Sequence, residues 1–131
     1  MNKYIPERGD VVWIDMQPQA GHEQSGRRPA IVLSPTSYSA KVGLAVFCPI
    51  TNQIKRYPFE VRIPSGFKVS GAILSDQIKS LDWKIRNTEF YDKLPEHIIL
   101  EILNKIKALL YSDNDEILST SVIWRFYFYV Q

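Results

Sequence analysis

Short apolar runs separated by turn-forming residues occupy the first two thirds of the chain and predict β-strands. Gly9 and Asp10 precede the first run, and Pro18 follows it. Between residues 59 and 63 apolar and charged side chains alternate, which is the period of a strand with one buried face. The expected strands comprise residues 11–16, 30–33, 44–50, 59–63 and 71–74, with residues 78–81 as a candidate continuation of the last.

The period becomes helical after Pro95. Apolar side chains then recur at spacings of three and four residues, so they share one face of a helix. This face contains Ile98, Ile99, Ile102, Leu103, Ile106, Leu109 and Leu110. His97 lies off it and is expected in solvent. The pattern therefore predicts a mainly β fold, a small and strongly bent sheet or barrel with a packed C-terminal helix.

Residues 17–27 show no apolar periodicity and contain Pro, Gly, Gln, Ser and paired Arg, so we expect a long loop. Loops on a rigid β scaffold are common sites of chemistry. Among the aromatic residues, Trp13 is expected in the core because it lies in an apolar strand. Trp83 and Tyr57 flank loops, and the pattern allows either a buried position or a base-stacking one.

With 131 residues, 45% of them hydrophobic, the chain can bury one core, so a single compact domain is expected. The lone Cys48 excludes an internal disulfide and a cysteine-based zinc site, and it suits a reducing compartment. The N-terminus has no apolar signal core, and no apolar run reaches the length of a membrane span. These features predict a cytoplasmic protein.

The net charge of +2 is unevenly distributed: residues 1–111 hold 15 Lys and Arg against 11 Asp and Glu. A basic face would attract a polyanion such as nucleic acid, and an ordinary solvated surface is the alternative. Cations in or beside the expected loops are Arg27, Arg28, Lys41, Lys55, Arg56, Lys79, Lys84 and Arg86.

Common catalytic signatures are missing from the sequence. It contains no Gly-rich phosphate loop, no HExxH, no GxSxG and no kinase motif. His22 and His97 are far apart in sequence and the carboxylates are scattered, so no metal site and no paired-histidine ribonuclease site is expected. Phosphate chemistry would have to use arginine, hydroxyl and carboxylate groups.

Five segments resemble the MazF/PemK family of toxin ribonucleases in order and spacing. They are GDVVW at 9–13, GHEQSGRRPAIVLSP at 21–35, PITNQ at 49–53, YPFEV at 57–61 and SDQIKSLDW at 75–83. The string G-x-E-Q-x-G-x-R-P is specific, whereas GD-x-x-W or DQ alone would be weak. The similarity covers roughly residues 4–111, so we expect a toxin-like domain at 1–111 and an extension at 112–131.

The resemblance implies an SH3-like barrel of the MazF/PemK/CcdB toxin type that forms a homodimer, with an RNA groove along the dimer interface. It implies cleavage of single-stranded RNA by the substrate's own 2′-hydroxyl, without a metal ion or cofactor, and neutralisation by a cognate antitoxin protein. A binding-only toxin is the alternative, because a related barrel poisons DNA gyrase without cutting nucleic acid.

Four residues are the catalytic candidates by this resemblance. Arg28 matches the family's catalytic arginine; its planar, permanently charged guanidinium suits a phosphate that gains negative charge. Thr51 matches a second active-site residue and could bond the phosphate or orient the 2′-hydroxyl, or it could only fasten a loop. His22 matches the PemK branch and could transfer protons. Glu23 fills the family's acidic loop position, where pairing with Arg28 to shape the loop is the alternative.

The candidate substrate contacts are Gln24, Arg27, Lys55, Asp76, Gln77 and Lys79. Asp76 matches an active-site carboxylate of the PemK branch, but Leu74 stands where that branch has arginine, which favours Arg28 and Thr51. Arg27 could instead be a solvated or backbone-contacting cation. Gln77 could contact a base or bond the sheet edge.

Residues 112–131 lie outside the resemblance. Residues 112–116 are polar and predict a linker, whereas residues 122–130 are aromatic and β-prone. This segment could add an edge strand, extend the dimer or mimic an antitoxin segment.

Overall fold

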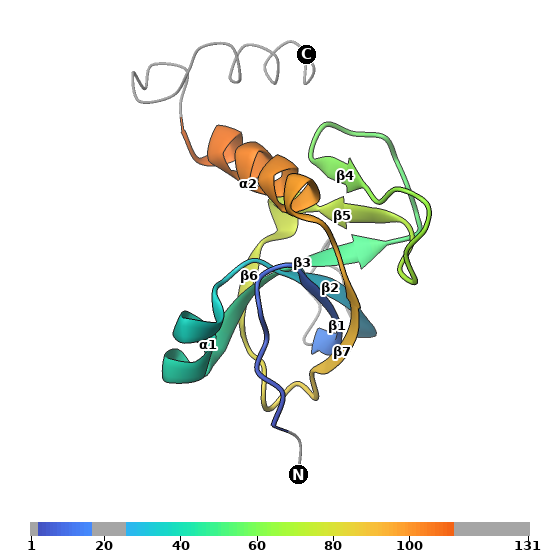
Figure 1. The fold of residues 1–131 in the computed structure, drawn as a ribbon. Helices are drawn as coiled ribbons and strands as arrows, with labels where there is room; N and C mark the ends of the chain where they lie inside the picture. Colours follow the sequence, from blue (N-terminus) through green and yellow to red (C-terminus); the bar gives the residue numbers. More distant parts are fainter. Residues whose placement is uncertain (1–2, 17–25, 112–131) are drawn as a thin grey trace.

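A computed structural model describes residues 3–16 and 26–111, and it confirms the expected mainly β architecture with a C-terminal helix (Figure 1). The elements are β1 (Asp10–Met16), β2 (Gly26–Val32), α1 (Thr36–Val42), β3 (Leu44–Thr51), β4 (Glu60–Arg62), β5 (Ala72–Leu74), the 3-10 turn η1 (Ser75–Gln77), β6 (Lys79–Asp82), β7 (Glu89–Lys93) and α2 (Glu96–Leu110).

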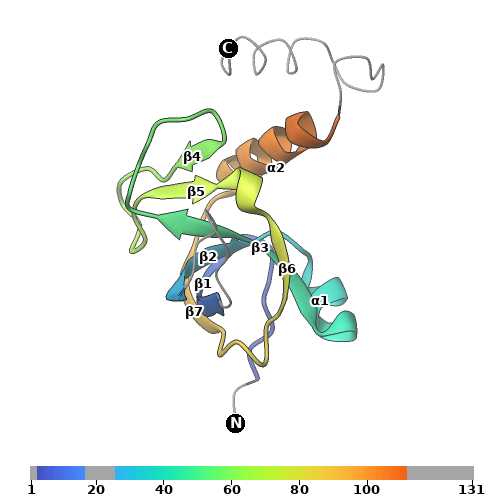
Figure 2. The ribbon, with the colours of Figure 1, turned by 180° about the vertical axis from the view of Figure 1, so that it is seen from behind.

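All described strand pairs are antiparallel, in the order β4-β5-β3-β2-β1-β7, and β6 also pairs with β3. β3 is the central strand. It pairs with β2 on one side, while on the other side β6 pairs with its first half and β5 with its end. The sheet curls strongly, with α2 across one end and α1 near the other (Figures 1 and 2).

Alternation along the strands gives the curled sheet two apolar cores. Val11 and Ile31 point toward α2, which buries Ile98, Ile99, Ile102 and Ile106 against them. The next residues, Val12 and Val32, point into the second core together with Phe47 and Trp83. The face that carries Val12, Val32 and Phe47 is called the inner face below.

One α-helix and one strand were not predicted from the sequence. α1 is short and buries only Ser39 among its seven residues, so it has no apolar stripe to detect. It ends at Gly43, which has a φ of 81° and donates its N–H to Ser39 O. β7 is an edge strand whose Phe90 is exposed, so its sequence lacks the alternation of a half-buried strand.

Two expectations about burial were wrong. Burial on α2 stops at Ile106; Leu109 and Leu110 are 43% and 73% exposed. Trp13 is only half-buried and packs on the Tyr91 ring at a centroid distance of 5.2 Å. Trp83, which the pattern left open, is buried and donates its indole N–H to Ser39 O at 3.0 Å. His97 is exposed, as expected.

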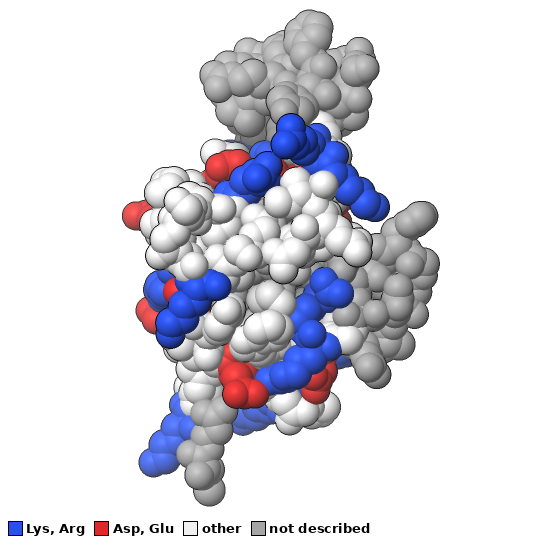
Figure 3. All heavy atoms as spheres, turned by 90° about the vertical axis from the view of Figure 1, so that its right-hand side faces the viewer, with Lys and Arg blue, Asp and Glu red and all other residues white. Residues whose placement is uncertain are grey.

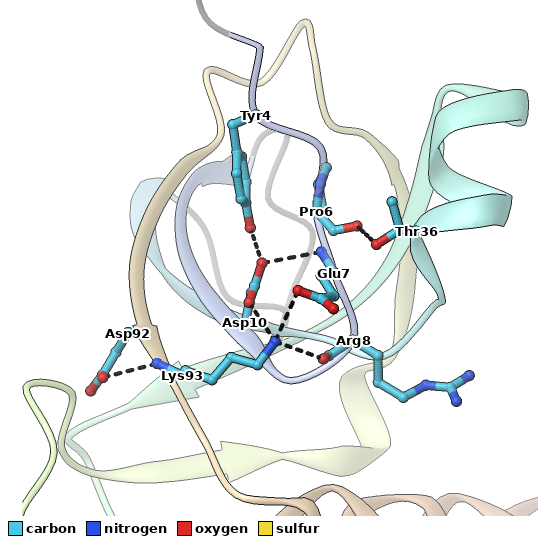
Figure 4. Close-up of polar contacts among 8 residues, drawn as sticks. All are labelled: Tyr4, Pro6, Glu7, Arg8, Asp10, Thr36, Asp92 and Lys93. Atoms are coloured by element: carbon cyan, nitrogen blue, oxygen red, sulfur yellow. Dashed lines mark hydrogen bonds and ion pairs between the residues drawn. The ribbon is translucent and has the colours of Figure 1, made fainter.

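A polar cluster fastens the N-terminal segment to the sheet (Figure 4). Lys93 Nζ lies 3.0 Å from Asp10 Oδ1 and 3.2 Å from Glu7 Oε2, and the Tyr4 hydroxyl donates to Asp10. Arg8 Nε donates to Leu33 O at 2.6 Å. These bonds hold the segment before β1 against β2 and β7. No helix in the described part of the chain has the length and hydropathy needed to cross a membrane.

Candidate functional site

The register of β2 and β3 brings Arg28 and Thr51 together. Ala30 and Pro49 form the last pair of this antiparallel ladder, and Arg28 and Thr51 lie two residues beyond it on their own strands. Because side chains alternate along a strand, both share the inner face with Ala30. Arg28 Nη1 donates to Ile50 O at 3.5 Å, which locates the guanidinium beside the end of β3.

Arg28 is half-buried, and burial lowers the pKa of its guanidinium from the ordinary value. Arginine still remains charged at neutral pH because its ordinary pKa is above about 12. A positive charge that has lost part of its water interacts more strongly with an anion than one in bulk solvent. Arg28 therefore places a partly desolvated guanidinium, which can donate from two nitrogens at once, at the edge of the inner face.

Thr51 is buried, with 7% of its surface exposed. Its Oγ1 accepts the N–H of Gln53 at 3.1 Å, so the hydroxyl proton can still be donated to another group. This bond also fixes the start of the loop after β3. The bond agrees with the reading of Thr51 as a residue that fastens a loop, and its role toward a phosphate or a 2′-hydroxyl stays a prediction.

Gly71 supports Thr51, and it was not among the residues singled out from the sequence. It has a φ of +112°, and a Cβ at this position would lie 2.2 Å from Thr51 O. Only glycine permits this approach of the two backbones. A glycine at the start of an apolar strand run is a known signal of close backbone approach and could have identified it.

Lys79 also belongs to this face. It pairs with Phe47 across β3 and β6, so its side chain leaves the sheet on the side of Arg28 and Thr51. Asp76 and Gln77 lie in η1, between the segments of β5 and β6 that pair with β3.

Asp76 has a defined partner in Tyr57. The Tyr57 hydroxyl donates to Asp76 Oδ1 at 2.6 Å, and burial together with this carboxylate raises the pKa of Tyr57. Asp76 itself is exposed. Tyr57 is half-buried and contacts the Phe59 ring at a centroid distance of 6.4 Å.

Two other candidates lie apart from this group. Arg27, adjacent to Arg28, points to the opposite face, where it forms ion pairs with Asp15 and Glu89. Lys55 is exposed in the connection between β3 and β4, and its backbone N–H donates to Glu60 Oε2 at 2.9 Å.

His22, Glu23 and Gln24 lie outside the described residues, as does the whole extension at 112–131. The segment that carries the first three joins Met16 to Gly26, which are partners in the β1–β2 ladder.

Cations on the face drawn in Figure 3 form several separate groups, some beside Asp or Glu, around a broad uncharged area. The basic surface is therefore not one continuous patch on this face. Within residues 3–16 and 26–111, no three side chains of His, Cys, Asp or Glu converge in a way that could hold a metal ion. Metal independence stays a prediction.

A curled antiparallel sheet crossed by a C-terminal helix, with Arg28 and Thr51 on adjacent strands, is a small barrel-like fold of the kind that the family resemblance implied. Comparison with protein families agrees: the model of the "PemK-like, MazF-like toxin of type II toxin-antitoxin system" matches residues 7–110. The chain belongs to this family, as its sequence motifs predicted.

Individual relatives support the assignment. The endoribonuclease toxin MazF of Escherichia coli K12 is 43% identical over 111 residues, covering 84% of this chain and 98% of the relative. Endoribonuclease EndoA of Bacillus subtilis is 34% identical, covering 81% and 91%. The crystal structure of MazF from Deinococcus radiodurans superposes with a TM-score of 0.80 at 46% identity, covering 82% and 98% of the two chains. A MazE-MazF structure from the same organism gives a TM-score of 0.75 at 46% identity, covering 82% and 97%.

Proposed function

We propose that this chain cleaves single-stranded RNA at short sequences, without a metal ion, as the toxin of a type II toxin–antitoxin system. Its class, an endoribonuclease toxin, follows from its family and from relatives named as endoribonucleases. One observation carries the proposed chemistry: the β2–β3 register puts a partly desolvated arginine and a threonine hydroxyl on the same face.

The reaction proposed is an internal transfer at one phosphate. The 2′-hydroxyl oxygen attacks the adjacent phosphorus while the bond from phosphorus to the 5′-oxygen breaks. A base takes the proton of the 2′-hydroxyl, and an acid supplies one to the departing 5′-oxygen. The products are a 2′,3′-cyclic phosphate and a free 5′-hydroxyl, so atoms and charge balance without water or a cofactor.

Arg28 stabilises this reaction by binding the phosphate oxygens as negative charge accumulates on them. Its high pKa makes it a poor proton carrier, so stabilisation is its main role. The Thr51 hydroxyl donates to a phosphate oxygen or orients the 2′-hydroxyl. His22 and Glu23 are the proposed proton carriers, since an imidazole and a carboxylate can change protonation near neutral or mildly acidic pH.

The remaining candidates would bind rather than react. Lys79 on the inner face and Lys55 in the β3–β4 connection attract the RNA backbone. Asp76 and Gln77 at the edge of β3, and Gln24 in the 17–25 segment, can bond base edges. We propose a cytoplasmic homodimer that a cognate antitoxin neutralises; the crystal structure of MazE-MazF from Deinococcus radiodurans supports a protein partner for the toxin.

The central test is cleavage of a long RNA in EDTA by the wild type and by Arg28→Ala. We expect discrete wild-type fragments that end in cyclic phosphate, and a rate loss on the order of a hundredfold or more in the variant, the usual cost of removing such a donor. Arg28→Lys should recover little because an ammonium cannot reproduce the paired donors of a guanidinium. Arg62→Ala, which removes an exposed arginine on β4, is the matched control.

Two outcomes would overturn the proposal. A folded wild-type protein that leaves RNA intact would favour a toxin that acts by binding alone. A folded Arg28→Ala protein that cuts at the wild-type rate would remove Arg28 from the chemistry. Binding to a 2′-O-methyl RNA, which cannot react, measures affinity separately in each variant.

A further inference from the structure

A second polar cluster lies on the face opposite Arg28. It consists of Asp15 at the end of β1, Arg27 on β2, Glu89 on β7, and Arg86 and Asn87 in the turn before β7. We call these five residues the strand clamp. The sequence suggested that Arg27 contacts the substrate, and the bonds it makes indicate a different role.

We propose that Arg27 is a positioning residue, which together with Asp15 and Glu89 fixes the end of the β1–β2 ladder and thereby the direction in which Arg28 projects. This inference rests on the proposed function, because it concerns the orientation of the residue assigned to the phosphate.

Arg27 joins three strands. Asp15 is its direct partner across β1 and β2, and Arg27 Nη1 lies 3.2 Å from Asp15 Oδ1. Its other terminal nitrogen, Nη2, bonds Glu89 Oε1 on β7, which pairs with β1 from the other side. The guanidinium therefore reaches across β1 and ties β2 to β7, near the point where the β1–β2 ladder ends at Met16 and Gly26.

Asp15 ties the turn before β7 to the same point. Its second oxygen accepts from Asn87 Nδ2 at 2.9 Å, and its backbone O accepts from Arg86 Nη1 at 3.0 Å. Its backbone N–H donates to Arg86 O at 3.0 Å. Asn87 has a φ of 53°, a conformation that asparagine tolerates better than most residues. The bonds from Asn87 and Arg27 lower the pKa of Asp15, which keeps the carboxylate charged.

The charges of the strand clamp argue against a phosphate contact at Arg27. Its guanidinium faces two carboxylates, Asp15 and Glu89, and an RNA phosphate that approached it would meet both negative charges.

Arg28, one residue along, leaves the strand on the other face. Fixing the Arg27 side chain on its face therefore fixes the backbone from which Arg28 extends. A shift of about 1 Å at a reacting group can cost on the order of a hundredfold in rate.

A double-mutant cycle separates positioning from RNA binding. The variants are Arg27→Ala, Asp15→Ala and the two together, with Glu96→Ala, an exposed carboxylate at the start of α2, as the control. Each single clamp variant should lower kcat on the order of tenfold to a hundredfold. The double variant should be no slower than the slower single one, since either change already breaks the pair. KM and affinity for 2′-O-methyl RNA should stay within about twofold of wild type, because no phosphate contact is lost.

The salt dependence of RNA binding gives an independent readout. If Arg27 contacts a phosphate, the fall of log K with log salt should become less steep in Arg27→Ala, by about 0.7 in the slope. Asp15→Ala would then tighten binding, because it removes a negative charge beside that contact. Either of these results would overturn the proposal, and so would additive effects on kcat. An unchanged slope with coupled losses in kcat supports it.

Two controls make the result unambiguous. Thermal unfolding shows whether each variant is folded at the assay temperature. Glu89→Gln, which removes the charge but keeps the shape of the side chain, replaces any variant that is unfolded there. Wild type and Arg28→Ala are assayed alongside. If the wild type does not cut RNA, the proposed function fails; if it cuts and Arg27→Ala matches it in kcat, only the strand clamp proposal fails.

Discussion

Replacing Gly71 with alanine should displace the end of β3 and with it the Thr51 hydroxyl. The new Cβ would lie 2.2 Å from Thr51 O and 3.0 Å from Thr51 C, both backbone atoms that cannot rotate away as a flexible side chain would. It would also lie 2.9 Å from Asn52 Oδ1. The backbone of residues 51–52 must therefore move, or β5 must withdraw from β3.

The expected loss of stability has two parts, and a substitution at Gly66 allows them to be separated. Both glycines have a φ above +100°, but a Cβ at Gly66 would meet no atom within 4 Å. Gly66→Ala therefore costs the backbone conformation alone, about 1–2 kcal/mol. Gly71→Ala adds overpacking of about 1–3 kcal/mol. In a domain of this size each kcal/mol lowers Tm by about 4 °C, so we expect losses of about 4–8 °C and about 8–20 °C.

The assay pairs thermal unfolding with RNA cleavage well below both Tm values. Gly66→Ala should cut at close to the wild-type rate. Gly71→Ala should be slower on the order of a hundredfold, the cost of a shift of about 1 Å at a reacting group. Equal Tm losses in the two variants would refute the steric reasoning. A folded Gly71→Ala protein with full activity would show that the position of Thr51 does not matter for cleavage.

Other changes test separate parts of the molecule. Thr51→Val keeps the shape but removes the hydroxyl, so it should slow cleavage while affinity for 2′-O-methyl RNA stays intact, and Thr51→Ser should restore the rate. Hydrogen bonds from Asn87 and Arg27 hold the pKa of Asp15 below its ordinary value of 3.8, so its stabilisation is present above that pH and is lost as the pH falls through the folded value. The Tm difference between wild type and Asp15→Asn should therefore shrink below about pH 4. Sedimentation should give twice the 15.2 kDa chain mass, and a monomer that cuts RNA at micromolar concentration would contradict a shared groove.

The elements that the sequence predicted well are those whose burial follows a simple period. β1 and β3 bury most of their residues, and α2 presents one apolar face to the sheet, so each leaves a clear apolar pattern. α1 and β7 leave none, because the first buries a single serine and the second is an exposed edge. The α2 pattern also continued to Leu110 although burial ends at Ile106, since a helical period shows which face is apolar but not how far the sheet beneath it extends.

The sequence predicted less of the candidate site than of the fold. Arg28 and Thr51 were chosen through family resemblance, and the β2–β3 register adds that both lie on the same face of adjacent strands. Their action on one phosphate stays a proposal. The partners of Arg27 could not be foreseen, because Glu89 lies 62 residues away and reaches Arg27 only through the β1–β7 pairing. Local spacing carries no information on such contacts, whereas a ladder register determines them directly.

Pro49 offers a physical reason why Asp76 and Gln77 lie in a turn and not in a strand. Proline has no N–H for a ladder, so a proline within an apolar run marks an interruption of pairing at that point. On one edge of β3, pairing with β6 ends at Phe47 and pairing with β5 begins at Ile50. Cys48 and Pro49 fall in the gap, and the chain fills it with η1 rather than with a strand. The interruption lets Asp76 leave the sheet beside Cys48, whose Sγ contacts Ser75 O, where a continuous ladder would have kept Asp76 in register.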